Sequence, residues 1–142
     1  MMEEKIQILL SSSGLDVNLS RSFVSIPEAG GVVIFEGLVR NHTRGKEVLR
    51  LEFEAYESMA ISELQKIAAE AFSRFDLHRI SIQHRVGVLG VGELPVVIAV
   101  SASHRKSAFE SCEYVIDRLK ETVPIWKKEI FSDGEEWVSA HP

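Results

Sequence analysis

Two lysines lie in a short segment whose other residues could change their chemistry. Lys120 and Lys127 flank Pro124 and Trp126 within the segment Leu119–Glu129. An amine that is partly desolvated beside an indole, or crowded by other cations, has a lowered pKa and can carry a proton or act as a nucleophile near neutral pH. The alternative is a pair of ordinary solvated lysines, the first of them favoured by the dipole at a helix C-terminus. The residue types alone leave both interpretations open.

A second group of cationic side chains is expected at the start of a helix. His104 and Arg105 follow Ser103, which is expected to cap that helix, at a place where acidic residues are normally favoured. Free backbone N–H groups together with a guanidinium and an imidazole can hold an anion, for which phosphate is the natural candidate. Arg40, at the end of an apolar run, is a weaker candidate of the same kind. The alternative for all three is an exposed side chain with its apolar stem on the surface.

Several familiar site patterns are missing from the sequence. It contains no H-x-x-x-H or cysteine-rich pattern, no G-x-S-x-G elbow and no Walker motif. Gly87, Gly90 and Gly92 are followed by an expected strand rather than a helix, so they indicate a hairpin loop and not a phosphate cradle. Cys112 lies on an apolar helix face and is expected to be a packed thiol. We therefore predict neither a metal site nor a bound cofactor.

The composition is that of an ordinary globular domain. The 142 residues include 45% hydrophobic and 26% charged residues, and a single domain over residues 1–142 is expected. A net charge of −5 argues against the broad basic surface of a nucleic-acid binder. A single cysteine and the absence of a long apolar run predict a cytoplasmic protein with no membrane span.

The hydrophobic periodicity predicts both strands and helices, without strict alternation of the two, and so an α+β fold with a mixed or antiparallel sheet and two long helices. The expected strands are 5–10, a largely buried 31–40, a half-exposed 49–55, 80–88, 95–101 and two short closing strands around Asp133-Gly134. The expected helices are a short one capped by Asn18, a long one from Ser58 to Phe75 and a long one from Ser103 to just before Pro124. The segment 41–46 is expected to be a polar loop.

The same residues form five segments that resemble, in order and spacing, the motifs of the molybdopterin synthase catalytic subunit family. They are Gly30–His42, His84–Gly87, Ser103–Glu110, Leu119-Lys120 with Pro124–Glu129, and Trp137-Val138. The resemblance covers nearly the whole chain and implies an α/β-hammerhead fold. It also implies a homodimer that binds two copies of a small ubiquitin-like sulfur carrier, giving a heterotetramer.

The implied activity is sulfur transfer. The carrier's C-terminal Gly-Gly thiocarboxylate would donate two sulfurs to cyclic pyranopterin monophosphate and form the dithiolene of molybdopterin. By this resemblance Lys120 and Lys127 are the catalytic candidates, and the substrate pocket is formed by these two lysines with Leu38, Val39, Arg40, His104, Arg105, Lys128 and Glu129. His141 stands where the family often has a basic residue, which leaves the role of the tail open.

Helix geometry adds an expectation that the motifs do not contain. If one helix runs from His104 to Lys120, its 16 steps (120 − 104) separate the two residues by about 24 Å, too far for one pterin to touch both. We therefore predict that the pocket is shared across the homodimer, with His104 and Arg105 of one protomer meeting Arg40, Lys120 and Lys127 of the other. The competing interpretation is a non-catalytic module that binds a phosphorylated metabolite or a ubiquitin-like protein.

Overall fold

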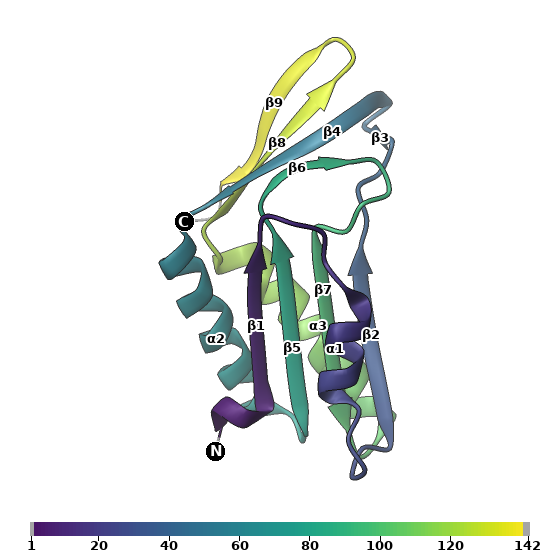
Figure 1. Ribbon diagram of the computed structural model, residues 1–142, viewed down its shortest axis with the longest axis vertical. Helices are drawn as coiled ribbons and strands as arrows, with labels where there is room; N and C mark the ends of the chain where they lie inside the picture. Colours follow the sequence, from purple (N-terminus) through teal and green to yellow (C-terminus); the bar gives the residue numbers. More distant parts are fainter. Residues whose placement is uncertain (1, 141–142) are drawn as a thin grey trace.

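The computed structural model describes residues 2–140, which form two sheets and three α-helices (Figure 1). The four-stranded sheet has the strand order β1-β5-β7-β2, in which β1 and β5 are parallel and the other neighbours are antiparallel. The strand bounds are β1 Ile6–Ser11, β5 Arg79–Arg85, β7 Val96–Ala102 and β2 Gly31–Gly37. Strand β7 is buried along its whole length, which places it in the centre of the core.

Helices cover both faces of this sheet. The short α1 (Val17–Val24) packs on β5 and β7 from one side, after the single 3-10 turn of Met2–Lys5 and strand β1. The two long helices α2 (Glu57–Arg74) and α3 (Arg105–Thr122) pack against each other on the opposite side (Figure 1). Each long helix buries one face, as its apolar spacing predicts.

The five-stranded sheet stands at one end of the four-stranded one (Figure 1). Its strand order is β3-β4-β8-β9, and β6 pairs with the other edge of part of β4. The bounds are β3 His42–Thr43, β4 Lys46–Ala55, β6 Gly87–Gly90, β8 Ile125–Phe131 and β9 Gly134–Ala140. One buried cluster joins the two sheets, because it includes Phe53 and Phe131 as well as Ile80 and Ile98. The predicted α+β class, with its two long helices and the hairpin at Asp133-Gly134, is confirmed.

Both short-range capping predictions were wrong. Helix α1 is capped by Asp16, whose side chain accepts a hydrogen bond from the Asn18 backbone N–H at 2.9 Å. Helix α3 has His104 as its N-cap, and the Ser103 hydroxyl instead pairs with His78 Nε2 at 2.9 Å. The predicted cap lies two positions after the true one in α1 and one position before it in α3, so in both places a nearby polar residue gave a competing cap signal.

The alternation predicted for the fourth strand fails at one point. A register shift between Val48 and Arg50 makes a bulge opposite β8, so Val48 is buried at 3% exposure while Leu49 is 46% exposed. Leu51 and Phe53 face the core as expected. The expected polar loop over 41–46 is also partly strand, since β3 folds back on the start of β4. A bulge inserts one extra residue, which inverts the side-chain pattern on one side of it.

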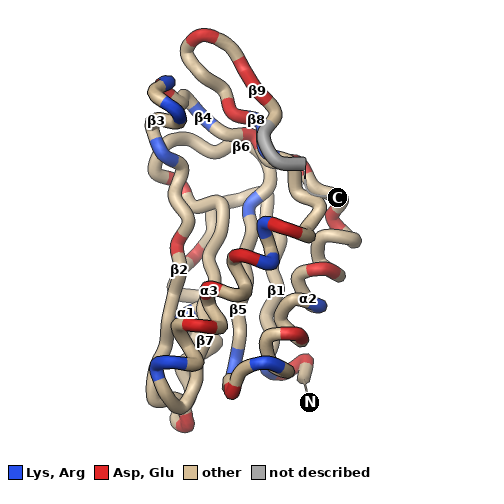
Figure 2. Tube along the Cα trace, turned by 180° about the vertical axis from the view of Figure 1, so that it is seen from behind, with Lys and Arg blue, Asp and Glu red and all other residues tan. Residues whose placement is uncertain are grey.

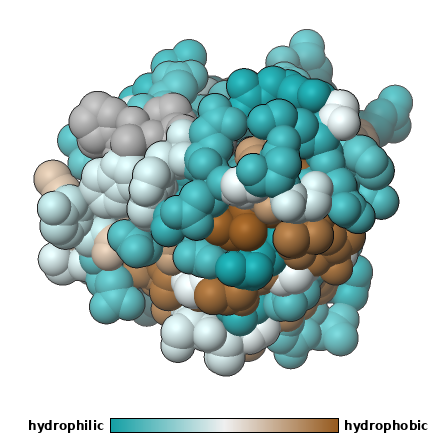
Figure 3. Space-filling model, turned by 90° about the horizontal axis from the view of Figure 1, so that it is seen from above, coloured by the Kyte–Doolittle hydropathy of each residue, from teal (hydrophilic) through white to brown (hydrophobic). Residues whose placement is uncertain are grey.

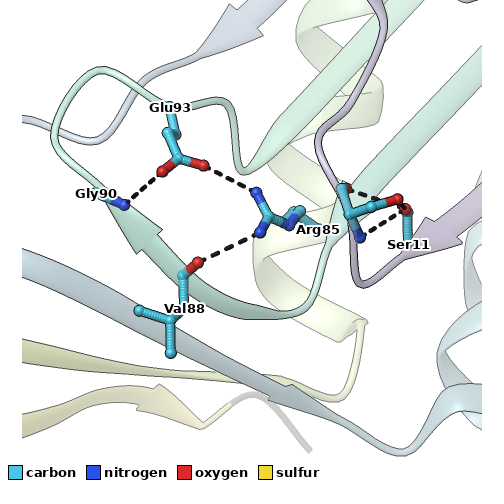
Figure 4. Close-up of polar contacts among 6 residues, drawn as sticks. Ser11, Arg85, Val88, Gly90 and Glu93 are labelled. Atoms are coloured by element: carbon cyan, nitrogen blue, oxygen red, sulfur yellow. Dashed lines mark hydrogen bonds and ion pairs between the residues drawn. The ribbon is translucent and has the colours of Figure 1, made fainter.

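The glycine-rich hairpin between β5 and β7 carries a strand of its own. The two flanking strands pair antiparallel as predicted, but the connection leaves the four-stranded sheet and contributes β6 to the five-stranded one. Arg85 stabilises this connection between β5 and β7 with two hydrogen bonds. Its Nη1 donates to Glu93 Oε2 at 2.9 Å, and its Nη2 donates to the Val88 carbonyl at 3.3 Å (Figure 4). Glu93 in turn accepts from the Gly90 backbone N–H at 3.0 Å. Positive φ angles of 96° at Gly87 and 87° at Gly92 let the chain turn at both ends.

Two expectations about burial also need correction. The strand predicted as largely buried over 31–40 ends at Gly37 and is only half-buried, with Val32 39% exposed. The apolar spacing of the third helix also predicts that Phe109 faces the core, but Phe109 is 61% exposed. Val32 lies on β2, the edge strand of the four-stranded sheet, and Phe109 lies on α3, which packs against β2. Apolar periodicity does not separate a face that packs within the chain from one that remains on its surface.

Candidate functional site

A cavity of about 520 Å³ opens where the two sheets meet the C-terminal end of α3. Its volume lies within the usual range for small-molecule sites. The polar residues on its wall are Arg40, His84, Lys120 and Lys127. The remainder is mostly apolar, comprising Phe35, Gly37, Leu38, Leu51, Phe53, Pro95, Val96, Ile116, Leu119, Val123 and Ile125. Viewed from the end that carries the five-stranded sheet, the surface likewise shows apolar side chains between hydrophilic ones (Figure 3).

The segment after β2 directs alternate side chains to the cavity. Leu38 and Arg40 line it, whereas Val39 between them is buried in the core at 2% exposure. The Val39 backbone is held on both sides, since its N–H donates to the Glu93 carbonyl at 3.0 Å and its carbonyl accepts from Gly92 at 2.9 Å. The Arg85–Glu93 pair therefore helps to position Arg40 through the backbone of Val39.

The two lysines reach the cavity from different elements. Lys120 lies in the last turn of α3, next to the buried Leu119, and the helix ends where the Val123 N–H bonds the Leu119 carbonyl at 3.1 Å. Lys127 lies on β8, which pairs with β4 at Phe53. Pro124 ends the helix and turns the chain from one lysine towards the other. Arg40 and the lysine pair Lys120 and Lys127, two separate sequence predictions, thus line the same cavity.

On strand β8, Lys127 and Glu129 point to one side and Lys128 points to the other. Lys127 Nζ lies 3.6 Å from Glu129 Oε1, and the Glu129 side chain is only 5% exposed. The other carboxylate oxygen of Glu129, Oε2, is buried without a hydrogen-bond partner among residues 2–140. Lys128 points the other way, with its Nζ 3.6 Å from Glu135 and 5.0 Å from the centre of the Trp137 ring. Its side chain does not line the cavity.

The indole expected beside the lysines belongs to a different surface. Trp126 packs edge-on against Tyr56, with ring centres 5.2 Å apart, and lines a shallow hollow with Trp137. Neighbouring residues on a strand point to opposite faces, so Trp126 and Lys127 cannot share a pocket. Desolvation by this indole is therefore not available to either lysine.

His84 is the residue of the cavity wall that the sequence analysis missed. It is 5% exposed, and its Nδ1 donates to the Arg85 carbonyl at 2.8 Å. Burial lowers the pKa of His84 to about 4, and the bond to the Arg85 carbonyl only partly opposes this shift. The imidazole is therefore neutral at pH 7. A titratable histidine inside the predicted strand 80–88 was the signal that could have identified it.

This buried histidine predicts acid sensitivity of the fold. In the unfolded chain His84 takes up a proton near pH 6.5, but in the folded protein only near pH 4. Unfolding therefore binds a proton in this window, and the free energy of unfolding should fall by roughly 3 kcal/mol as the pH drops from about 6.5 to about 4. The facing cations Arg40, Lys120 and Lys127 also oppose a charged imidazole.

Urea unfolding of wild type and His84→Gln at several pH values measures this effect. The glutamine does not titrate, so the variant should lose less stability than wild type between pH 6.5 and 4.5. Parallel profiles for the two proteins would contradict the assignment of the proton uptake to His84.

His104 and Arg105 lie away from this cavity. Both are exposed at the N-terminal end of the 18-residue α3, whereas Lys120 lies in its last turn. The His104 side chain makes no capping hydrogen bond. The helix therefore holds the two groups of cations at its opposite ends, as the helix arithmetic anticipates.

Other kinds of site receive no support from the described residues. No cluster of three or more His, Cys, Asp or Glu side chains among residues 2–140 could hold a metal ion. Burial raises the pKa of the Cys112 thiol to about 11, as expected for a packed cysteine. No helix in this part of the chain is long and apolar enough to cross a membrane. His141 lies outside the described residues.

Comparison with known proteins gives a consistent result. Residues 10–122 match the family model described as MoaE protein. A Bacillus subtilis (strain 168) protein named molybdopterin synthase catalytic subunit is 53% identical over 78% of this chain and 71% of its own length. A protein of the same name from Pyrococcus abyssi is 39% identical over 97% and 93% of the two chains.

Solved structures agree with these sequence matches. The crystal structure of molybdopterin synthase from Staphylococcus aureus contains a chain with a TM-score of 0.87 and 40% identity, covering 95% of this chain and 97% of that one. A chain in the complex of subunits 1 and 2 of molybdopterin-converting factor from Helicobacter pylori 26695 has a TM-score of 0.75. Its identity is 21%, with 96% and 93% of the two chains covered, so this likeness concerns the fold alone.

Proposed function

The chain belongs to the MoaE protein family of molybdopterin synthase catalytic subunits, and we propose that it transfers sulfur to cyclic pyranopterin monophosphate. Two sulfurs, donated by the C-terminal thiocarboxylate of a small ubiquitin-like carrier, become the dithiolene of molybdopterin. The observation that carries this proposal is the cavity in which Arg40, Lys120 and Lys127 converge. Such a cavity suits an anionic pterin phosphate and an anionic thiocarboxylate together.

The two lysines take different parts in the proposed reaction. Lys120, exposed at the rim, lies nearest the donor carbonyl and stabilises the oxyanion that forms as sulfur leaves the carrier. Lys127 acts as general acid or base on the pterin, with Glu129 holding its ammonium in place at 3.6 Å. Glu129 itself does not line the cavity, so its part in the proposed reaction is to hold the Lys127 ammonium. Leu38 adds apolar contact at the rim. The side chains of Val39 and Lys128 do not line the cavity, so these residues contribute by positioning the backbone of the neighbours that do.

We also propose that the pocket is completed by a second copy of the chain. A surface groove between β2 and α3 has an exposed Phe109 and is lined by apolar residues together with three acidic ones. The lining comprises Val33, Ile34, Phe35, Phe109, Cys112 and Ile116 with Glu110, Glu113 and Asp117. Cys112 is eight residues from His104 (104 + 8) and eight from Lys120 (120 − 8). A two-fold axis crossing α3 there would bring His104 and Arg105 of one protomer to Lys120 of the other. Apolar residues at the point through which that axis must pass support the shared site.

The carrier subunit is part of the same proposal. The Helicobacter pylori structure is described as a complex of subunits 1 and 2, which supports a two-component assembly. Two carriers on one homodimer would form a heterotetramer, each carrier tail entering one pocket. The single cysteine agrees with a reducing, cytoplasmic setting for this chemistry.

Two other functions explain the cavity less well. A non-catalytic module for a phosphorylated metabolite or a ubiquitin-like protein would favour bidentate arginines over a pair of lysines. A nucleic-acid binder needs a continuous basic surface, but acidic and basic residues are interspersed along α2 and α3 (Figure 2).

The proposed function is tested by incubating the protein with thiocarboxylated carrier and cyclic pyranopterin monophosphate. Mass spectrometry should detect the dithiolene product, and carrier ending in an ordinary carboxylate should give none. Absence of product with a carrier that is active with another synthase would remove the proposed activity.

A further inference from the structure

One wall of the cavity carries a buried imidazole that the proposed sulfur transfer does not use. We propose that His84 selects the heterocycle of the substrate by accepting, at Nε2, a hydrogen bond from a ring or amino N–H group. This role rests on the proposed function, because it takes the ligand to be a pterin. It assigns recognition of the ring to a different residue from those that hold the anionic groups.

The protein environment fixes which nitrogen of His84 can accept a hydrogen bond. The Arg85 carbonyl, 2.8 Å from Nδ1, can only accept, so Nδ1 carries the proton. A neutral imidazole protonated at Nδ1 has its lone pair on Nε2. The Phe53 ring also holds the imidazole by a T-shaped contact, with ring centres 5.4 Å apart and the ring planes at 75°. The acceptor is therefore set in place before a ligand binds.

The other polar side chains on the wall cannot do this task. Arg40, Lys120 and Lys127 are hydrogen-bond donors only. An N–H group of a ligand finds no partner among them, and His84 is the only acceptor side chain lining the cavity within the described residues. The cations suit the phosphate and the thiocarboxylate, whereas the neutral imidazole suits the ring.

The space around His84 also fits a flat heterocycle. Phe35, Phe53, Val96 and Ile125 supply apolar surface on the same wall. Within residues 2–140 the Nε2 atom has no hydrogen-bond partner. In small-molecule pockets, a few polar groups usually fix the orientation and specificity of the ligand, while apolar side chains supply most of the contact surface.

Calorimetric titration of the dimeric protein with two ligands tests this assignment. His84→Leu should bind cyclic pyranopterin monophosphate about 10-fold or more weakly, because the ligand N–H loses its partner. Its affinity for inorganic phosphate, which probes the cations alone, should stay within about two-fold of wild type. His84→Gln keeps an acceptor oxygen near the Nε2 position and should recover most of the affinity. His42→Leu, at an exposed histidine on β3, is the matched control and should bind both ligands like wild type.

A measurement on the wild-type protein covers the case in which His84→Leu does not fold. The 15N resonance of Nε2 should have the position of an unprotonated nitrogen. It should move towards the protonated position when the pterin is added, but not when phosphate is added. An unchanged resonance with bound pterin, or equal loss of pterin and phosphate binding in a folded His84→Leu, overturns the assignment.

Failure of the assignment is distinguishable from failure of the proposed function. Wild-type protein that forms dithiolene product while folded His84→Leu binds substrate normally overturns the role of His84 alone. Wild-type protein that binds the pterin through His84 but forms no product with active carrier overturns the sulfur transfer alone.

Discussion

Replacing Lys120 with alanine is expected to lower kcat for dithiolene formation about 100-fold or more, because the group that stabilises the oxyanion is lost. Folding should hardly change, since Lys120 is exposed in the last turn of α3 and forms no ion pair with the described residues. Single-turnover assays with thiocarboxylated carrier measure the chemical step directly. Lys120→Arg separates the possible roles, because it keeps the charge but cannot exchange a proton near neutral pH.

Lys66→Ala is the matched control for this loss. Lys66 is an exposed lysine on the other long helix, 3.8 Å from Glu63 and remote from the cavity. Its removal should leave kcat unchanged, because an exposed ion pair contributes little. A Lys120→Ala protein that turns over at the wild-type rate would exclude this lysine from the chemistry.

Mixing two inactive variants is expected to restore activity if the site is shared across the dimer. One chain carries His104→Ala and the other Lys120→Ala, so a mixed dimer has one pocket with both residues intact. Random pairing makes about half of the dimers mixed, each with one of its two pockets active, and should restore roughly one quarter of wild-type turnover. Co-expression of differently tagged chains followed by purification of the mixed dimer allows a direct assay.

The control for this experiment pairs two variants at the same end of the helix. His104→Ala mixed with Arg105→Ala leaves no intact pocket, so turnover should remain low. Equal recovery in both mixtures, or no recovery with His104→Ala and Lys120→Ala, would contradict the shared site. Each variant alone should be tested as a homodimer to establish its residual activity.

Much of the fold could be predicted from local patterns. The periodicity of 58–75 and 103–122 predicted both long helices, and the alternating and apolar runs predicted most of the strands. Local patterns could not predict the bulge between Val48 and Arg50, and they could not predict that β6 leaves its hairpin to pair with β4. Both depend on pairing with β8 or β4, whose residues are distant in the sequence.

The candidate site divides in a similar way. Residue types alone indicated an anion site at His104 and Arg105, with Arg40 as a weaker candidate, and proton transfer or nucleophilic attack at Lys120 and Lys127. The motifs around these residues indicated the family. The role of His84 was not visible, because a histidine in a strand acquires a low pKa only when the fold buries its side chain. The segment Lys127–Glu129 appeared as one unit, yet strand alternation sends Lys128 to the opposite face.

The sequence by itself determined the identity of the elements, the kinds of charge available and the family motifs, because these depend on residue type and short spacing. Only the tertiary structure decided which of those residues share a cavity. Burial and strand pairing act between residues that are far apart in the chain, so they bring Arg40, His84, Lys120 and Lys127 to one wall. His104 and Arg105 stay outside this cavity, because α3 is a rigid helix that holds its two ends apart.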